Sequence, residues 1–229
     1  MKYSIRVNEV KNNEGNLKGF ATVVFSDCFK ITNIAILENT ERGQLFVSMP
    51  RYRSSERDEN GNVYKDICNP ITKEFREELY GNILKAYENL QKQDKEQGQN
   101  QKQEREECQE VIEFSVSVTP FEREGSNIKG LARIYFEDSF IVNNVNILQG
   151  KENLFVAMPS YKTKQMDENG KPVYQEVCYP VTKAFRDKLY KEIISVYQWE
   201  VNKQKNQQDT NNHSARQQQP SNDRRRQKR

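Results

Sequence analysis

The sequence predicts an α+β protein made of two tandem small domains, each an antiparallel sheet with a C-terminal helix, followed by a disordered basic tail. The first observation is an internal repeat, because Leu-Phe-Val-Ser-Met-Pro at residues 45–50 returns as Leu-Phe-Val-Ala-Met-Pro at 154–159. The second is the order of patterns in each copy, in which strand-like segments come first and a helical stripe comes last. The third is a polar, basic segment after the second copy.

The repeat divides the chain into four parts. A period near one hundred residues is the size of a small domain, so it indicates a tandem duplication rather than a solenoid. Among 229 residues we expect a first domain at 1–90, a polar linker at 91–110, a second domain at 111–200 and a disordered Gln/Arg-rich tail at 201–229. The linker and the tail hold too few apolar residues to form a core.

The first half of each copy is predicted to form a sheet. Residues 3–8 alternate apolar and polar side chains, and three further strands are expected at 20–25, 29–37 and 44–49. Pro50 ends the fourth strand because proline cannot donate a hydrogen bond to a ladder. Gly19 and Gly130 enter the second strand at matched positions, which suits a bulge or a close approach of the backbone to another group.

A polar segment at 51–63 follows the Met-Pro step and ends in Asn60-Gly61, a strong hairpin signal. Acidic pairs precede the Asn-Gly step in both copies, at 58–59 and 167–168. Such pairs can bind a cation or perform acid/base chemistry. Their place beside Asn-Gly favours a solvated loop tip instead.

Each copy is predicted to close with a helix that packs on one face of its sheet. Thr72 and Thr182 are suitable N-caps, and apolar residues recur at helical spacing behind them. The stripe of the first copy is Phe75, Leu79, Ile83, Ala86 and Tyr87, and that of the second is Phe185, Leu189, Ile193, Val196 and Tyr197.

Composition argues against several classes of function. The four cysteines and the single histidine, His213, show no metal-ligand spacing, and we find no nucleophile motif or phosphate loop. We therefore expect no enzyme activity, no cofactor and no metal. The sequence also shows no export signal and no run of eighteen apolar residues, so we expect a cytoplasmic protein with reduced thiols and no membrane association.

Positive charge is concentrated in two places. Residues 201–229 hold 8 basic and 2 acidic side chains and end in a run that includes Arg224, Arg225 and Arg226. Residues 183–198 of the second helix hold 4 basic and 2 acidic side chains, whereas residues 73–88 of the first hold 3 and 4. A polyanion should therefore prefer the second copy. The alternative, that these charges only form a solvated helix face with i,i+4 pairs, stays open.

Both copies resemble the stage V sporulation protein G (SpoVG, septation regulator) family. The resemblance rests on the Gly-Phe-Ala or Gly-Leu-Ala strand, the Phe-Val-x-Met-Pro block and the Thr-Lys-x-Phe-Arg helix start, and it covers about 85 residues twice. It implies small α+β domains that dimerise through their sheets and bind DNA or RNA as regulators of gene expression, sporulation or cell division. Because this chain holds two copies, an internal pseudo-dimer or a homodimer through sheet edges is expected.

The resemblance also implies binding residues at the basic start of the C-terminal helix. By position these are Lys73 and Arg76 in the first copy and Lys183 and Arg186 in the second, with Lys188 following. Beyond the Met-Pro step, Arg51 and Lys162 are further candidates, and the tail arginines should assist. A non-enzymatic protein-interaction scaffold in septation or sporulation, in which the Gln-rich segments contact other proteins, is the alternative.

Overall fold

The structure is a computed structural model that describes residues 1–11, 15–59, 61–96, 112–121 and 124–216. The first copy contains β1 (Tyr3–Glu9), β2 (Leu17–Phe25), β3 (Phe29–Asn39), β4 (Gln44–Ser48), β5 (Arg51–Asp58), β6 (Gly61–Asp66), β7 (Cys68–Pro70) and α1 (Lys73–Glu96). The second contains β8 (Phe114–Pro120), β9 (Ile128–Phe136), β10 (Phe140–Gln149), β11 (Leu154–Ala157), β12 (Ser160–Met166), β13 (Pro172–Glu176), β14 (Cys178–Pro180) and α2 (Lys183–Arg216). The predicted α+β class, with two tandem units of antiparallel sheet and helix, is confirmed.

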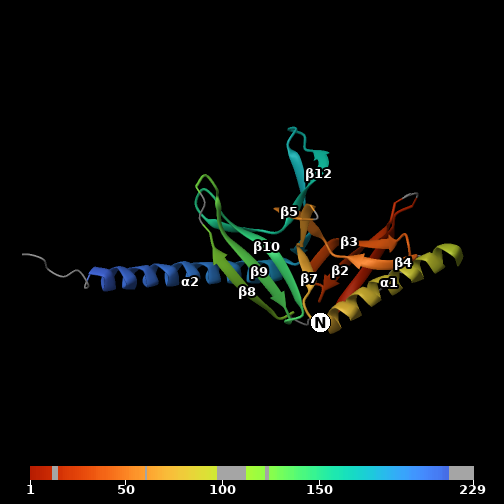
Figure 1. Ribbon diagram of the computed structural model, residues 1–229, viewed down its shortest axis with the longest axis horizontal. Helices are drawn as coiled ribbons and strands as arrows, with labels where there is room; N and C mark the ends of the chain where they lie inside the picture. Colours follow the sequence, from red (N-terminus) through yellow and green to blue (C-terminus); the bar gives the residue numbers. More distant parts are fainter. Residues whose placement is uncertain (12–14, 60, 97–111, 122–123, 217–229) are drawn as a thin grey trace, which may run out of the picture.

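The main sheet of each copy is an antiparallel meander covered on one face by its own helix. Strands β1 to β4 follow one another in the first copy, and β8 to β11 do so in the second. Helix α1 packs against β1 and β4, and α2 packs against β8 and β11. The predicted stripes lie at these contacts, since Phe75, Leu79 and Ile83 of α1 are buried. The two helices leave the molecule in opposite directions (Figure 1).

The copies exchange their shortest strands, and this detail escaped the sequence analysis. Strand β7 of the first copy pairs with β10 of the second, with Cys68 opposite Val142. Strand β14 of the second copy pairs with β3 of the first, with Cys178 opposite Ile31. Each main sheet therefore gains its fifth strand from the other copy.

The strand exchange joins the two cores. The buried residues of both copies form one hydrophobic cluster rather than two. At the junction the Phe25 ring lies 5.0 Å from the Phe140 ring and 6.2 Å from the Phe136 ring, centroid to centroid. The Phe25–Phe140 pair is edge-to-face and the Phe25–Phe136 pair is tilted. Aromatic pairs at these distances are favourable, so buried ring contacts between the copies stabilise the junction.

Both glycines at the entry to the second strand meet a tyrosine of the covering helix. A Cβ atom added at Gly19 would lie 2.8 Å from the Asn8 carbonyl oxygen and 3.2 Å from the Tyr87 ring. A Cβ atom added at Gly130 would lie 3.1 Å from the Tyr197 ring. The ladder register also shifts beside Gly19, so the expected close approach and the expected bulge are both present.

The polar segments after the Met-Pro steps form two separate hairpins, β5–β6 and β12–β13. Both stand in the middle of the molecule, between the two main sheets (Figure 1). In the second hairpin the Asp167 carboxylate accepts hydrogen bonds from the backbone N–H groups of Asn169 and Lys171, at 2.9 and 2.7 Å. This acidic residue closes the tight turn at an exposed tip, as the Asn-Gly signal predicts.

Helix α2 is longer than predicted. It continues beyond the expected boundary at 200 as far as Arg216, so residues 201–216 are helical instead of disordered. Gln and Lys are good helix formers, and extending a helix that is already nucleated on the sheet has no further nucleation cost. Helix α1 similarly enters the predicted linker and ends at Glu96. The remainder of the predicted linker and tail, residues 97–111 and 217–229, lies outside the described residues.

Candidate nucleic-acid interface

The two helix starts are fixed by threonine caps. The Phe75 N–H donates to Thr72 Oγ1 and the Phe185 N–H donates to Thr182 Oγ1, both at 3.3 Å. Each bond satisfies a backbone donor that has no partner within the helix. The predicted N-caps are confirmed.

The two arginines of the predicted site hold the helix start to the preceding exchanged strand. Arg76 Nη2 donates to the Pro70 carbonyl oxygen at 3.1 Å, and Arg186 Nη2 donates to the Pro180 carbonyl oxygen at 3.3 Å. Sequence reasoning assigned these residues to nucleic acid alone and missed this structural contact. A guanidinium group has five N–H donors, so one bond to a carbonyl leaves others available, and both residues are exposed.

The lysines of the two helix starts lie in different electrostatic surroundings. Lys73 Nζ lies 3.8 Å from the Glu77 carboxylate, and Glu74 adds a negative charge to the first turn of α1. The first turn of α2 contains no acidic residue, and Lys183 is exposed there. Lys188 Nζ, one turn further on, lies 5.4 Å from the Phe114 ring centroid, a cation–π contact.

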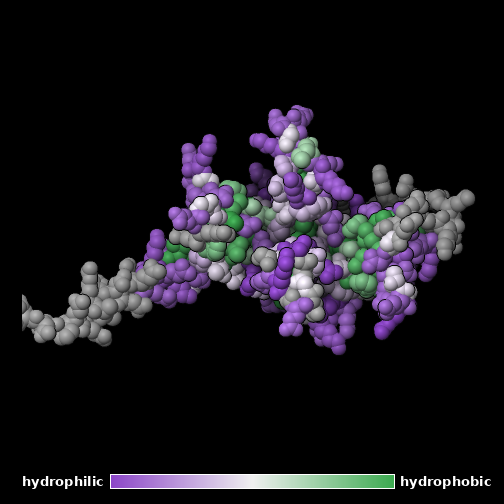
Figure 2. Space-filling model, turned by 45° about the horizontal axis from the view of Figure 1, so that its top comes forward, coloured by the Kyte–Doolittle hydropathy of each residue, from purple (hydrophilic) through white to green (hydrophobic). Residues whose placement is uncertain are grey.

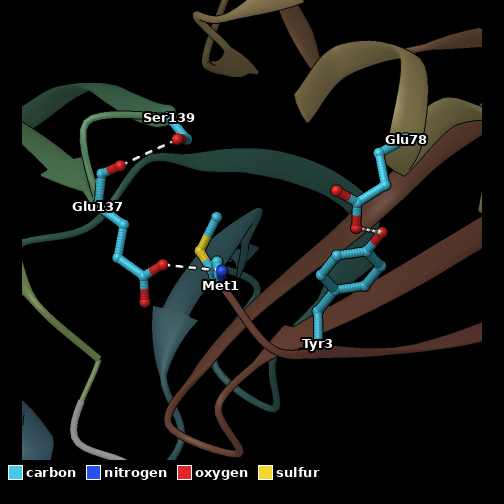
Figure 3. Close-up of polar contacts among 5 residues, drawn as sticks. All are labelled: Met1, Tyr3, Glu78, Glu137 and Ser139. Atoms are coloured by element: carbon cyan, nitrogen blue, oxygen red, sulfur yellow. Dashed lines mark hydrogen bonds and ion pairs between the residues drawn. The ribbon is translucent and has the colours of Figure 1, made fainter. Parts of the chain in front are cut away.

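A further carboxylate of α1 is bound by a tyrosine of β1. The Tyr3 hydroxyl donates a 2.8 Å hydrogen bond to Glu78 Oε1 (Figure 3). Burial and this bond to the carboxylate raise the pKa of Tyr3 to about 12. Figure 3 also shows Glu137 on the other copy, whose carboxylate lies 2.8 Å from the Met1 amine. The N-terminal segment of the first copy thus contacts both α1, through Tyr3, and the second copy, through Met1.

The hairpin candidates lie apart from the helix starts in the chain and pair with tyrosines. Arg51 donates to Ser48 Oγ at 2.7 Å, and its guanidinium carbon lies 5.9 Å from the Tyr64 ring centroid. Lys162 is opposite Tyr174 in the second hairpin, and both are exposed. Arg224, Arg225 and Arg226 lie outside the described residues.

In the described part of the chain, no group of three or more His, Cys, Asp or Glu side chains is arranged to hold a metal ion. Neither helix contains, within the residues described, a stretch long and apolar enough to cross a membrane.

The repeated sheet-and-helix unit, its capped basic helix start and its exchanged strand define a duplicated α+β protein with one cationic helix start. The family model SpoVG matches residues 1–89 and 111–199, and the chain therefore belongs to the SpoVG family, with two tandem copies. The resemblance inferred from the sequence motifs is thus confirmed.

Several relatives share the name "Putative septation protein SpoVG" and match about one copy each. The protein from Treponema denticola is 34% identical over 74 residues, which is 32% of this chain and 73% of the relative. The protein from Acholeplasma laidlawii is 35% identical over 72 residues, 31% of this chain and 70% of the relative. The protein from Agathobacter rectalis is 27% identical over 86 residues, 38% of this chain and 91% of the relative.

Proposed function

We propose that this protein is a cytoplasmic, nucleic-acid-binding regulator with a role in bacterial septation or sporulation. The relatives named for septation support the biological role. The observation that supports nucleic-acid binding is the cationic start of α2, which carries Lys183, Arg186 and Lys188 without an acidic residue in its first turn. The function involves no reaction and no cofactor.

The start of α2 suits a phosphate group for two physical reasons. The first-turn N–H groups and the helix dipole favour negative charge at a helix N-terminus. Lys183 is the first residue of α2, so its ammonium group adds a full positive charge close to those donors. The two helix starts differ at two positions, where Glu74 and Glu78 of α1 are replaced by Ala184 and Lys188 of α2. Both helices keep an acidic residue four positions after the first lysine, Glu77 in α1 and Asp187 in α2. DNA or RNA should therefore bind mainly through the second copy.

A charge-reversal experiment tests the proposal. Binding of labelled duplex DNA and single-stranded RNA to the full chain is measured by fluorescence anisotropy across a salt series. Lys183→Glu with Lys188→Glu should weaken binding and reduce the slope of log K against log salt by about 1.8 for duplex DNA and about 1.4 for single-stranded RNA, since each phosphate contact contributes about 0.9 and about 0.7 respectively. Arg186 is left unchanged because its bond to the Pro180 carbonyl supports the fold.

The matched control makes the same change of charge in the first copy. Lys73→Glu with Lys85→Glu should alter affinity much less, because that helix already carries several acidic residues. Equal effects of the two double variants would assign binding to overall charge and contradict the proposed site. Undiminished binding by the second-copy variant would also contradict it.

One observation favours the alternative, a protein-interaction scaffold. Helix α2 extends well beyond its sheet (Figure 1), and Trp199 on it is 59% exposed. Exposed tryptophan is a frequent anchor at protein interfaces. In that case Lys183→Glu with Lys188→Glu leaves the cellular function intact, whereas Trp199→Ala removes it.

The chain should act as its own pseudo-dimer. The exchanged strands β7 and β14 complete both sheets within one chain, so the family's sheet-mediated pairing is satisfied without a second molecule. The expected solution mass is that of one 27.0 kDa chain, measured by light scattering after size exclusion. A mass of two chains at micromolar concentration would contradict this proposal.

A further inference from the structure

The two main sheets each have a face that no helix covers. Adjacent strand residues point to opposite faces, and residues opposite one another in register share a face. Tyr3 packs against Phe75 of α1, and Phe114 packs against Phe185 of α2, so these side chains mark the covered faces. The opposite faces are called the outer faces below. Figure 2 shows apolar surface over both sheets, on either side of the middle hairpins.

The outer faces expose aromatic and large apolar side chains at equivalent positions. Phe20 and Phe46 of the first copy are 37% and 41% exposed, and Leu131 and Phe155 of the second are 40% and 47% exposed. Phe46 lies opposite Leu37 in the ladder, and Phe155 lies opposite Leu148. Single exposed apolar side chains are common, but large ones grouped on one face and repeated in both copies are typical of an interaction surface.

The same faces are positively charged without compensation. Following the register, Arg6 and Lys30 lie on the first outer face and Arg133 lies on the second, whereas no strand position on either face holds Asp or Glu. Among the described residues, no carboxylate pairs with these three cations. Lys30 Nζ instead lies 5.9 Å from the ring of Tyr179, contributed by the exchanged strand β14.

Neutral hydrogen-bonding groups complete the surface. Thr22 lies opposite Arg6, and Ser117 lies opposite Arg133, so each cation has a hydroxyl group beside it. Asn146 lies opposite Leu131 in the second ladder. Hydroxyl and amide groups can both donate and accept hydrogen bonds, as the edges of nucleobases require.

We propose that the outer faces of both sheets bind the unpaired bases of single-stranded nucleic acid, with Phe46 and Phe155 as stacking platforms and Arg6, Lys30 and Arg133 facing the phosphates. This inference rests on the proposed function and adds its ligand class and a second surface, distinct from the start of α2. Open antiparallel sheets that carry aromatic rings stack two or three bases in known RNA-binding modules. A duplex keeps the faces of its bases stacked internally, so it cannot use the rings.

The charge pattern favours this occupant over an apolar peptide or a second copy of the chain. Among the residues described, the outer faces contain cations, hydroxyl groups and amides but no carboxylate, and a second copy would bring the same cations against them. A polyanion with flat apolar bases complements both features, since its phosphates meet the cations and its bases meet the rings.

The test compares single-stranded and duplex binding in the full chain. A labelled twelve-nucleotide oligouridine and a labelled duplex are titrated with wild type, with Phe46→Ala/Phe155→Ala and with Phe46→Tyr/Phe155→Tyr. Loss of one base stack lowers affinity roughly 5- to 150-fold. The alanine variant should therefore bind oligouridine at least about tenfold more weakly, whereas the tyrosine variant should bind like wild type. Duplex affinity should stay within about twofold, as should the oligouridine affinity of the control Trp199→Ala.

The outcomes separate this inference from the proposed function. If wild type binds both ligands and the alanine variant binds oligouridine undiminished, the sheet faces are not the site, although nucleic-acid binding stands. If wild type binds neither ligand, the proposed function fails and this inference fails with it. If the alanine variant keeps oligouridine binding but loses self-association, the faces contact protein and the inference is overturned. Thermal melting of both variants identifies any loss through unfolding, and the tyrosine variant retains the packing.

Discussion

Replacing Phe140 with alanine should destabilise both copies at once. Phe140 begins β10 in the second copy and is fully buried. Its ring lies 5.0 Å from Phe25 and 6.5 Å from Phe75, both of the first copy and both edge-to-face. Removing a buried phenylalanine costs about 3–5 kcal/mol. The two ring contacts add about 0.5–1.5 kcal/mol each beyond the buried area, so about 1–3 kcal/mol of the loss is interaction between the copies.

That loss is large compared with the whole free energy of unfolding, which is about 5–15 kcal/mol for a typical domain. Urea denaturation followed by circular dichroism measures the total change. Hydrogen exchange then shows where it acts, and amide protection in β2 and β3 of the first copy should fall together with protection in β9 and β10.

A double-mutant cycle measures the interaction between the Phe25 and Phe140 rings directly. Phe25→Leu and Phe140→Leu, alone and combined, should show a coupling of about 0.5–1.5 kcal/mol. A coupling near zero would mean that the rings do not interact across the junction. Unchanged protection of the first copy in the Phe140→Ala variant would likewise show that the two cores unfold independently.

Three further predictions concern stability and thiol chemistry. Gly19→Ala should cost about 1–3 kcal/mol in urea denaturation, because the new methyl group meets the Asn8 carbonyl at 2.8 Å; an unchanged midpoint would contradict the close approach. Folding raises the pKa of Tyr3 from its usual value near 10 to about 12, so its contribution to stability is complete below pH 10 and is lost as the pH rises towards 12. Between pH 9 and pH 11 the urea midpoint of Tyr3→Phe should therefore fall less than that of wild type, and parallel curves would refute this. The Cys68 and Cys178 thiols are fully buried, and their mutual hydrogen bond together with burial holds the pKa of Cys68 well above its usual value. Ellman's reagent should therefore modify these two thiols only in denaturant. Rapid modification in the native protein would disprove their burial.

Local sequence patterns were sufficient to predict the main strands and the two helices. The strands at residues 3–8, 20–25, 29–37 and 44–49 were predicted from alternation and turn residues, and β1 to β4 match them within three residues. Threonine caps and apolar spacing located both helices. These features depend on interactions between residues that are close in the chain, which patterns record directly.

The strand exchange could not be predicted in the same way. Strand β7 consists of only three residues, Cys68–Pro70, which is too short for an alternating pattern, and its partner β10 is far away in the sequence. The repeat predicts that the copies can pair through sheet edges, but it does not identify β7 and β14 as the strands that do so. The structural role of Arg76 was missed for a related reason, because a bond to the carbonyl of Pro70 leaves no mark on residue spacing.

The exposure of the rings on the outer faces could not be predicted from the sequence pattern. Phe46 belongs to the Phe-Val-x-Met-Pro block, where alternation fixes opposite faces for neighbours but does not say which face the helix covers. Only the register, with Phe46 opposite Leu37 and away from α1, assigns it to the open side. Exposure of 41% at such a residue is a property of the assembled sheet.

Joining two copies in one chain allows their surfaces to differ, which is impossible in a symmetric dimer. Two identical subunits present the same surface twice, and any substitution appears on both. Here each half completes the other's sheet while its own surface changes independently, so α1 carries Glu74 and Glu78 where α2 carries Ala184 and Lys188. The outcome is a molecule whose two halves share a fold but present different surfaces, which two identical subunits cannot do.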